Sequence, residues 1–227
     1  MPIIELKNVS KIYKMGDNKV YALDKANLKI NEGEFVAIFG PSGSGKSTLM
    51  HIIGCLDIPT QGTVFLEGKD ISKFSESELA TIRGKTIGFI FQTFNLFQTL
   101  TVLENVMLPM VFQDMPAKER KKRAKELIEY VGLGHRVDHR PAELSGGEQQ
   151  RVAVARSLAI NPKIILGDEP TGNLDSKTGK KIMEGLKEVN KEGKTVILVT
   201  HDASLASYAN KIVHIKDGKI EKIEKNK

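Results

Sequence analysis

Gly40-Pro41-Ser42-Gly43-Ser44-Gly45-Lys46-Ser47-Thr48 is the stretch of sequence that decides the fold of this chain. It matches the phosphate-binding loop pattern G-x-x-x-x-G-K-[ST]. Residues 35–39 before it form an apolar run typical of a buried strand, and residues 49–53 after it can continue as a helix. The pattern binds phosphate when it lies between a strand and a helix, whereas a plain glycine-rich turn needs neither neighbour. The stretch therefore predicts a nucleoside triphosphate held at the start of a helix.

The residue types in this loop fit the chemistry of a triphosphate. Glycines let successive backbone N–H groups point at one anion, and the N-terminus of the following helix adds partial positive charge. Lys46 is expected to contact the β- and γ-phosphates, and Ser47 to offer an oxygen to Mg²⁺. The residues predicted to bind the nucleotide in this loop are Gly40, Ser42, Gly43, Ser44, Gly45, Lys46, Ser47 and Thr48.

Composition narrows the class of protein. The 227 residues are 40% hydrophobic and 27% charged, as in ordinary globular proteins. The net charge of +6 collects mainly in residues 118–123 and in residues 211–227. Neither stretch interleaves aromatic with basic side chains, so nucleic-acid binding is not expected.

Cysteine content and hydropathy indicate the compartment. The single cysteine, Cys55, excludes an internal disulfide framework and fits a reducing environment. Charges at Glu5 and Lys7 argue against a secretory signal, and no apolar run reaches the ~18 residues of a membrane-spanning helix. The chain is therefore expected to be cytoplasmic unless another protein holds it at a membrane.

Strand and helix patterns alternate along the chain, which predicts an α/β fold with a parallel sheet. Strands are expected at residues 3–9, 26–30, 35–39, 63–66, 87–91, 164–166 and 195–199, and a hairpin turns at Asp217-Gly218 between residues 212–215 and 219–223. Helices are expected at residues 75–83, 116–131 and 176–190. Helical patterns dominate between residues 94 and 162, which predicts a helical insert.

Two carboxylates follow the apolar run at residues 164–166, namely Asp168 and Glu169. Ligands of such sheets bind at the carboxyl ends of the strands. Asp168 is therefore expected to hold Mg²⁺, and Glu169 to orient or deprotonate the attacking water. An exposed acidic turn is the alternative, and the phosphate loop argues against it.

A second glycine-rich turn opens another predicted helix. Ser145 and Glu148 have the spacing of a capping box, S-x-x-E. A cap alone does not require Gly146 and Gly147, because each glycine costs about 1 kcal/mol against alanine in a helix interior. Bare backbone at a helix N-terminus is instead suited to an anion. The sequence thus predicts a second surface that faces phosphate.

The chain resembles the nucleotide-binding subunit of ABC transporters, because it carries in the same order the phosphate loop, Gln92, LSGGEQQR (residues 144–151), Asp168-Glu169, Asn173-Leu174-Asp175 and His201. More narrowly, residues 54–57, 92–109 and 168–176 are similar to the lipoprotein-release, macrolide-export and cell-division branch of that family. Two positions depart from the common pattern. Glu148 stands where glutamine is usual, and Gly167 stands where a bulkier apolar residue often precedes the Asp-Glu pair.

The resemblance implies the ABC ATPase fold, which is a P-loop NTPase core with a mixed sheet, an N-terminal antiparallel β subdomain and a helical insert. It implies a single domain over residues 1–227. Residues 1–92 and 163–227 would form the core with the β subdomain, and residues 93–162 the helical subdomain that carries the signature turn.

The resemblance also assigns roles to matching residues. Tyr13 resembles the aromatic residue that stacks on adenine, with simple packing as the alternative. Ser47, Gln92 and Asp168 would surround Mg²⁺. The catalytic set would be Glu169 as general base with Lys46, Gln92 and His201, the last of these contacting the γ-phosphate. Asp175 would couple the two sites of a dimer, and the turn of Ser145, Gly146, Gly147 and Glu148 would bind the γ-phosphate held by the other subunit.

The function implied is that of an ATP-hydrolysing subunit whose two copies close head to tail on ATP. This cycle would drive separate membrane-spanning partner chains, for export or for extraction from the membrane, at the inner face of the cell membrane. Residues 94–100, from Phe94 to Leu100, are expected to dock on that partner because they are rich in large apolar side chains; ordinary core is the alternative. Met107, Met110 and Met115 lie nearby and would suit an adaptable contact surface.

Other roles remain open at this stage. A DNA-repair or chromosome ATPase would insert a long coiled coil between phosphate loop and signature, and no sustained heptads occur here. A translation factor of the same superfamily would carry two nucleotide domains. A regulator that binds ATP without turnover would not need Glu169. A cell-division signalling role stays an alternative to transport.

Overall fold

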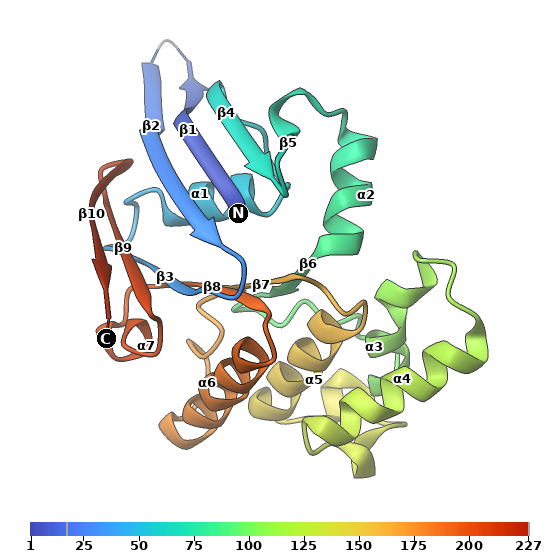
Figure 1. The fold of residues 1–227 in the computed structure, drawn as a ribbon. Coiled ribbons are helices and arrows are strands. Elements are labelled where there is room, and N and C mark those ends of the chain that lie inside the picture. The colour runs from blue at the N-terminus through green and yellow to red at the C-terminus, as the bar shows by residue number, and fades with distance from the viewer. Residues whose placement is uncertain (17, 227) are drawn as a thin grey trace. The chain divides into compact units, whose positions relative to one another are not determined.

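The computed structural model of the chain describes residues 1–16 and 18–226 and divides into two compact units (Figure 1). The first unit comprises Met1–Arg83 with Lys187–Lys227, and the second comprises Gly84–Leu186. Among the described residues, none of the helices has the length and apolar character needed to cross a membrane.

An antiparallel sheet forms one part of the first unit. Its strands are β1 (Pro2–Met15), β2 (Asn18–Asn31), β4 (Gln61–Leu66) and β5 (Lys69–Asp70), in the order β2-β1-β4-β5. Buried apolar and exposed polar residues alternate towards the end of β2, so one face of the strand packs on the core. The expected antiparallel β subdomain is confirmed. Strands β1 and β2 run further than the apolar alternation predicts, because they pair with each other beyond it as a hairpin.

The second group of strands in this unit carries the phosphate loop. Strand β3 (Phe35–Phe39) lies between β8 (Thr195–Thr200) and β9 (Lys211–Lys216) and is parallel to both, while β10 (Lys219–Lys225) pairs antiparallel with β9. Residues 35–38 and all of β8 are buried, which explains their continuous apolar runs. The sheet is therefore mixed, and the hairpin predicted at residues 217–218 is confirmed.

Three helices and a 3₁₀ turn complete the first unit. They are α1 (Lys46–Ile53), η1 (Ile71–Lys73), α2 (Glu76–Thr86), whose last residues belong to the second unit, and α7 (Ala203–Ala206). Helix α1 packs against β2, β4 and β8, and α7 packs against β3 and β8. The phosphate loop thus joins a buried strand to a helix that is packed along most of its length.

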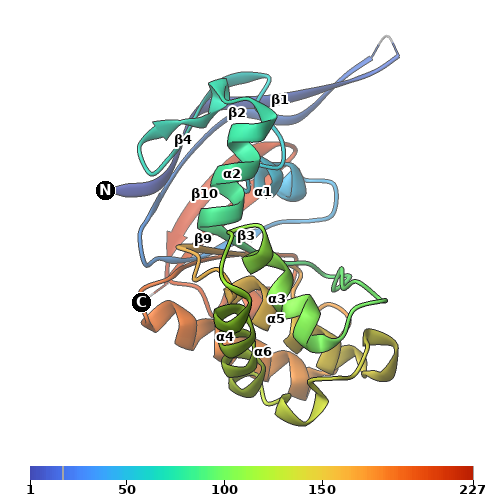
Figure 2. The ribbon, with the colours of Figure 1, turned by 90° about the vertical axis from the view of Figure 1, so that its right-hand side faces the viewer.

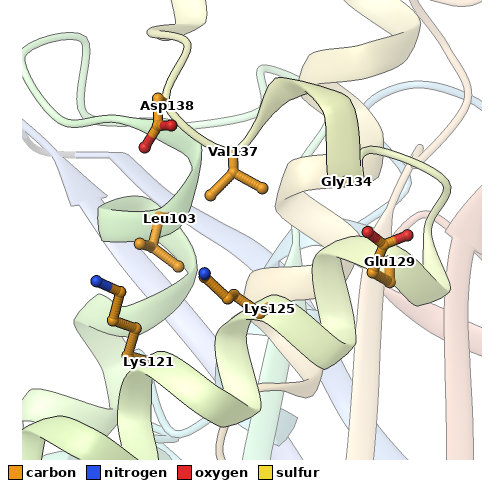
Figure 3. Close-up of a pocket in the computed structure, with 7 residues that line it drawn as sticks. All are labelled: Leu103, Lys121, Lys125, Glu129, Gly134, Val137 and Asp138. Carbon is orange, nitrogen blue, oxygen red and sulfur yellow. The ribbon is translucent and has the colours of Figure 1, made fainter.

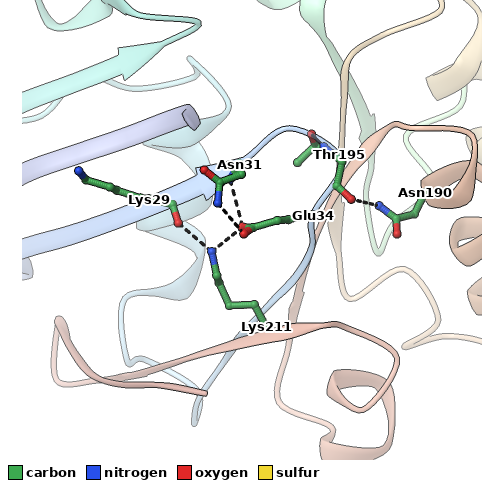
Figure 4. A network of polar contacts seen from close by, with 7 residues as sticks. Lys29, Asn31, Glu34, Asn190, Thr195 and Lys211 are labelled. Carbon is green, nitrogen blue, oxygen red and sulfur yellow. Dashed lines mark hydrogen bonds and ion pairs between the residues drawn. The ribbon is translucent and has the colours of Figure 1, made fainter. Parts of the chain in front are cut away.

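A network of polar contacts fixes the turn that leads into β3 (Figure 4). The Glu34 carboxylate accepts hydrogen bonds from Asn31 and pairs with the buried Lys211 ammonium. Burial raises the pKa of Glu34, but the hydrogen bonds from Lys211 and Asn31 outweigh it and leave the pKa below its usual value. Asn190 donates to the carbonyl oxygens of Gly33 (2.9 Å) and Lys194 (2.7 Å). These contacts join the N-terminal ends of β3, β8 and β9. They therefore support the parallel register in which Phe39 at the C-terminal end of β3 pairs with Thr200 at the C-terminal end of β8.

The second unit contains a pair of strands and a group of helices, α3 to α6, which are labelled in Figure 2. Strand β6 (Ile87–Ile90) is parallel to β7 (Ile164–Asp168). The helices are α3 (Val102–Val111), α4 (Ala117–Tyr130), α5 (Gly146–Leu158) and α6 (Ser176–Lys191). The last residues of α6 belong to the first unit. Two 3₁₀ turns, η2 (Gly134–Arg136) and η3 (Pro141–Glu143), lie between α4 and α5. Helix α3 packs against α4 and α5, and α5 also packs against α4 and β6. The predicted helical region after residue 93 is thus a packed layer of helices.

Candidate functional site

The phosphate loop lies between β3 and α1, as the sequence predicts. Gly40 passes so close to β9 that an added Cβ atom would lie 2.1 Å from the Ile215 carbonyl oxygen. Gly43 has a φ of 75°, a left-handed conformation that favours glycine, and open space where a side chain would be. One glycine therefore lets the loop approach the sheet, and the other lets it curl.

Two side chains in the loop suit an anion. The Lys46 side chain is buried, and its Nζ donates to the Pro41 carbonyl oxygen at 2.7 Å, so the ammonium lies across the loop. The Ser44 hydroxyl is buried and has no hydrogen-bond partner in the part of the chain that the structure describes. Buried hydroxyls are nearly always hydrogen-bonded. A cationic group and an orphaned hydroxyl at a helix N-terminus fit the phosphates of a nucleotide.

His201 lies at the same edge as the phosphate loop. Strands β3 and β8 are parallel neighbours, and Phe39 at the end of β3 pairs with Thr200 at the end of β8. The loop and His201 follow directly after these two residues. Because parallel strands present their carboxyl ends together, His201 and the loop lie at the same edge of this sheet.

Tyr13 lies on β1 and is 39% exposed. Its hydroxyl donates to Asp57 Oδ2 at 3.1 Å, and the Lys11 ammonium lies 5.2 Å from the ring centroid. Lys11 in turn pairs with Asp57 at 2.5 Å. The ring is thus held by a charged pair and kept at the surface, which suits stacking on a flat ligand; its role towards adenine stays a prediction.

Gln92, Asp168 and Glu169 lie at the ends of neighbouring strands of the second unit. Strands β6 and β7 are parallel, with Ile90 opposite Gly167, so all three residues lie at the carboxyl ends of this pair. Glu169 has a φ of 44°, which is rare for a residue with a side chain. Asn173 fixes the segment further, because its Nδ2 donates to the Gln92 carbonyl oxygen at 2.9 Å.

Gly167, which departs from the family pattern, packs closely on Pro170. A Cβ atom at this position would lie 3.3 Å from Pro170 Cγ, and the other ring atoms follow at 3.6 Å. The proline ring would therefore have to shift by a few tenths of an ångström to admit a Cβ atom. A bulkier residue here would push Pro170 aside, next to Glu169.

The signature turn forms the capping box that the sequence predicts. Ser145 is the N-cap of α5, and its Oγ accepts from the Glu148 N–H at 3.3 Å. Glu148 Oε2 accepts from both Ser145 N and Ser145 Oγ at 2.8 Å. Hydrogen bonds from the Ser145 backbone and hydroxyl, helped by the charge of Arg136, hold the pKa of Glu148 below its usual value. The carboxylate is therefore ionised as it closes the turn.

Asp175 also acts as a helix cap. Its Oδ1 accepts from the N–H groups of Lys177 (3.1 Å) and Thr178 (3.0 Å) at the start of α6. Bonds from Thr178 and Lys177 hold the pKa of Asp175 below its usual value. Its expected part in coupling two sites stays a prediction.

The predicted residues fall into two sets. The first unit holds Tyr13, the phosphate loop with Lys46 and Ser47, and His201. The second unit holds the remaining residues, which are Gln92, Ser145, Gly146, Gly147, Glu148, Asp168, Glu169 and Asp175. Action of the two sets on one nucleotide stays a prediction.

Sequence reasoning missed the residues that hold segment 94–100. Asn105 is fully buried on α3; its Oδ1 accepts from Phe97 N at 2.9 Å, and its Nδ2 donates to the carbonyl oxygens of Phe97, Leu100 and Thr101. Arg156 on α5 donates to the carbonyl oxygens of residues 94 and 95 at 2.8 and 2.5 Å. The only sequence signal was a lone asparagine within the apolar run of α3.

A cavity of about 450 Å³ lies elsewhere in the second unit, between α3, α4 and the segment after η2 (Figure 3). Lys121 and Lys125 of α4 border it together with Leu103 and Val137. None of the predicted site residues lines this cavity.

Comparison with known proteins identifies the family. The family model described as ABC transporter matches residues 23–172. An uncharacterized ABC transporter ATP-binding protein of Thermotoga maritima is 55% identical over 98% of this chain and 95% of its own length. The macrolide export ATP-binding/permease protein MacB of Brucella melitensis is 50% identical over 96% of this chain, which spans 34% of that longer protein.

A solved structure agrees with these matches. The dimeric structure of the ATP-binding cassette MJ0796 in a post-hydrolysis state, bound to ADP and Pi, superposes with a TM-score of 0.92 at 53% identity and covers 98% of each chain. The resemblance drawn from the sequence is therefore confirmed, together with its ABC ATPase fold. The chain belongs to the ABC transporter family, as an ATP-binding and ATP-hydrolysing subunit.

Proposed function

We propose that two copies of this chain close head to tail around two ATP molecules and that this cycle drives separate membrane-spanning subunits. The observation that carries the proposal is the pair of helix N-termini suited to phosphate, one in each compact unit: the loop with Lys46 and Ser44, and the Ser145–Gly147 turn capped by Glu148. In the closed dimer, each triphosphate would lie on the loop of one copy and touch the signature turn of the other.

Within one copy, Lys46 neutralises the β- and γ-phosphates and the ring of Tyr13 stacks on the base. Ser47, Gln92 and Asp168 offer the hydroxyl, amide and carboxylate oxygens that Mg²⁺ prefers, and the ion would offset phosphate charge when bound. His201 contacts the γ-phosphate from the neighbouring strand end.

Glu169 acts as the general base towards the attacking water. General-base loss typically lowers the rate by about 10²–10⁴-fold. Closing the dimer brings the carboxylates of Asp168 and Glu169 from both copies into one interface, and like charges oppose this. The γ-phosphate supplies the attraction through Ser145 and Gly147, so hydrolysis removes the link and the dimer opens.

The partner subunit docks on segment 94–100. Phe97 is 54% exposed there although it is large and apolar, while the neighbouring Leu96 is buried. Asn105 and Arg156 hold the backbone of this segment, so it presents a fixed surface. Met107 and Met115 are partly exposed and can contribute, whereas the expected contribution of Met110 is wrong because Met110 is fully buried. Through this contact the chain is held at the inner face of the cell membrane, for export or extraction.

The oligomeric state in three nucleotide conditions tests the dimer. The Glu169→Gln variant should bind ATP, lose steady-state hydrolysis and carry less charge in the interface. It should be monomeric without nucleotide, dimeric with ATP and monomeric with ADP by analytical ultracentrifugation. Lys46→Ala is the control and should fail to dimerise because it binds ATP weakly. Equal mass with ATP and ADP would show that the γ-phosphate does not hold the dimer.

Charge substitution tests the docking surface. Phe97→Asp should abolish stimulation of ATPase activity by the membrane partner and leave basal ATPase activity within about twofold. Phe112→Asp is a matched control, because Phe112 is 76% exposed and lies outside the segment. If Phe97→Asp unfolds the protein, residue 97 belongs to the core and the docking assignment is wrong.

A further inference from the structure

Arg136 contacts the carboxylate that closes the signature turn. Its Nε lies 3.3 Å from Glu148 Oε1, and the two side chains are 35% and 16% exposed. On its other side, Arg136 Nη1 lies 2.9 Å from His139 Nε2. The guanidinium at the end of η2 is therefore placed between a neighbouring ring and the first turn of α5.

Both oxygens of Glu148 are engaged. Oε2 accepts hydrogen bonds from the backbone and hydroxyl of Ser145. Oε1 forms an ion pair with Arg136, whose buried Nε has no hydrogen-bond partner among the described residues. The uncharged glutamine that is usual at this position could form the cap without adding charge. A carboxylate instead places a full negative charge in the turn that is proposed to receive a γ-phosphate, and the two charges repel each other.

The cap itself does not need an arginine. Ser75 and Glu78 form the same reciprocal pair at the start of α2, with Oε2 of Glu78 accepting from Ser75 N at 2.8 Å and from Ser75 Oγ at 2.7 Å. Within the described residues, no ion pair involves Glu78. The capping pair at Ser145 can therefore form without Arg136, and the contact with Arg136 is additional to it.

We infer that Arg136 is a positioning residue for the signature turn: it offsets the charge of Glu148 and holds this carboxylate in the cap, so that Ser145 and the glycines can receive the γ-phosphate of the partner copy's ATP. The inference rests on the proposed function. It assigns a specific role in ATP-driven dimer closure to a residue outside the signature motif.

A double-mutant cycle tests the inference. In the Glu169→Gln background, Arg136→Ala should raise the ATP concentration needed for half-maximal dimerisation by about fivefold, the size expected for a partly buried ion pair. The same change made together with Glu148→Gln should have less than about a twofold effect, because the charge to be offset is gone. Arg136→Lys should lie between the two, since it keeps the charge and loses the planar fork.

A matched control and a second readout separate the possible failures. Arg140→Ala removes one positive charge from the same segment and should leave the ATP dependence unchanged. ATP binding to the separate copies, measured by titration, should not change in any Arg136 variant, because the phosphate loop is untouched. If Arg136→Ala does not fold, Arg136→Lys with and without Glu148→Gln completes the cycle.

Two outcomes of the cycle would overturn the inference. One is that Arg136→Ala raises the ATP concentration for half-maximal dimerisation equally with Glu148 in place and with Glu148→Gln. Arg136 would then act independently of the charge at position 148. The other is no effect in either background. Ser145→Ala distinguishes failure of the proposed function: if this variant still dimerises at the ATP concentration of its parent, the signature turn does not bind the γ-phosphate. Loss of the dimer in Ser145→Ala with no effect of Arg136→Ala overturns the inference alone.

Discussion

Replacing Asn105 by alanine should destabilise the second unit and loosen the proposed docking segment. The Asn105 side chain is fully buried and forms one accepted hydrogen bond, from Phe97 N at 2.9 Å. It also donates to the carbonyl oxygens of Phe97 (3.1 Å), Leu100 (3.1 Å) and Thr101 (3.0 Å). Alanine removes all of these contacts and leaves a small cavity.

The size of the loss follows from the groups left without partners. Thr101 O keeps a hydrogen bond from Asn105 N at 2.9 Å, and Phe97 O keeps one from Leu100 N at 3.2 Å. Phe97 N and Leu100 O lose the bonds from the side chain. An unsatisfied buried group costs about 1–3 kcal/mol, and the segment can relax towards water. We therefore expect the free energy of unfolding to fall by about 3 kcal/mol. For a chain of this length, that lowers Tm by about 6–12 °C.

Thermal and urea unfolding would measure this loss, with two companion variants. Asn105→Asp should be at least as destabilising as alanine, because its carboxylate would face the three carbonyl oxygens that now accept from Nδ2. Gln98→Ala is the control; Gln98 is exposed and donates one bond to Leu96 O at 3.2 Å, so its loss should be below about 0.5 kcal/mol. An Asn105→Ala variant within about 0.5 kcal/mol of the parent would refute the reasoning.

Three further predictions concern stability and reactivity. Gly40→Ala should lower the free energy of unfolding by about 3 kcal/mol or more, because the new Cβ would lie 2.1 Å from a carbonyl oxygen. Gly43→Ala meets open space and should lower it only by the ~1–2 kcal/mol that a left-handed backbone costs. Urea unfolding of the two variants compares these losses. Burial raises the pKa of the Cys55 thiol to about 11, so a thiol reagent at pH 8 should modify it only after unfolding, and rapid reaction of the native protein would contradict this. Hydrogen bonds from their cap residues hold the pKa values of Glu78 and Glu104 below the usual 4.5. The stability that these two carboxylates contribute is therefore complete above pH 4.5 and is lost as the pH falls below it. Glu104→Gln should flatten the dependence of Tm on pH in this acidic range, and an unchanged slope would exclude the effect.

The features that the sequence predicted correctly are those written in local patterns. The strand before the phosphate loop is apolar because β3 is buried among parallel neighbours, and the hairpin at residues 217–218 has its own turn signal. The capping box at Ser145 needs only residues three positions apart, so its spacing is visible in the chain. The ends of strands were less visible, because β1 and β2 extend wherever each finds a partner.

Contacts between distant segments could not be predicted in this way. Asn105 and Arg156 bind backbone carbonyl groups, which carry no side-chain identity, so the sequence of segment 94–100 gives no sign of them. The close contact of Gly167 with the ring of Pro170 is likewise not visible in the sequence.

Arg136 shows why a motif is an incomplete description of a site. A carboxylate at position 148 suits a helix N-terminus, and this electrostatic argument holds for the capping box. It considers only the helix, however, and not the phosphate that the same turn is proposed to meet. A negative charge that stabilises the helix would weaken the phosphate contact unless a cation offsets it, and the structure places Arg136 there, twelve positions earlier in the chain. The substitution at position 148 is therefore best understood together with its partner, and a chain that carried Glu148 without an arginine at position 136 should need more ATP to close.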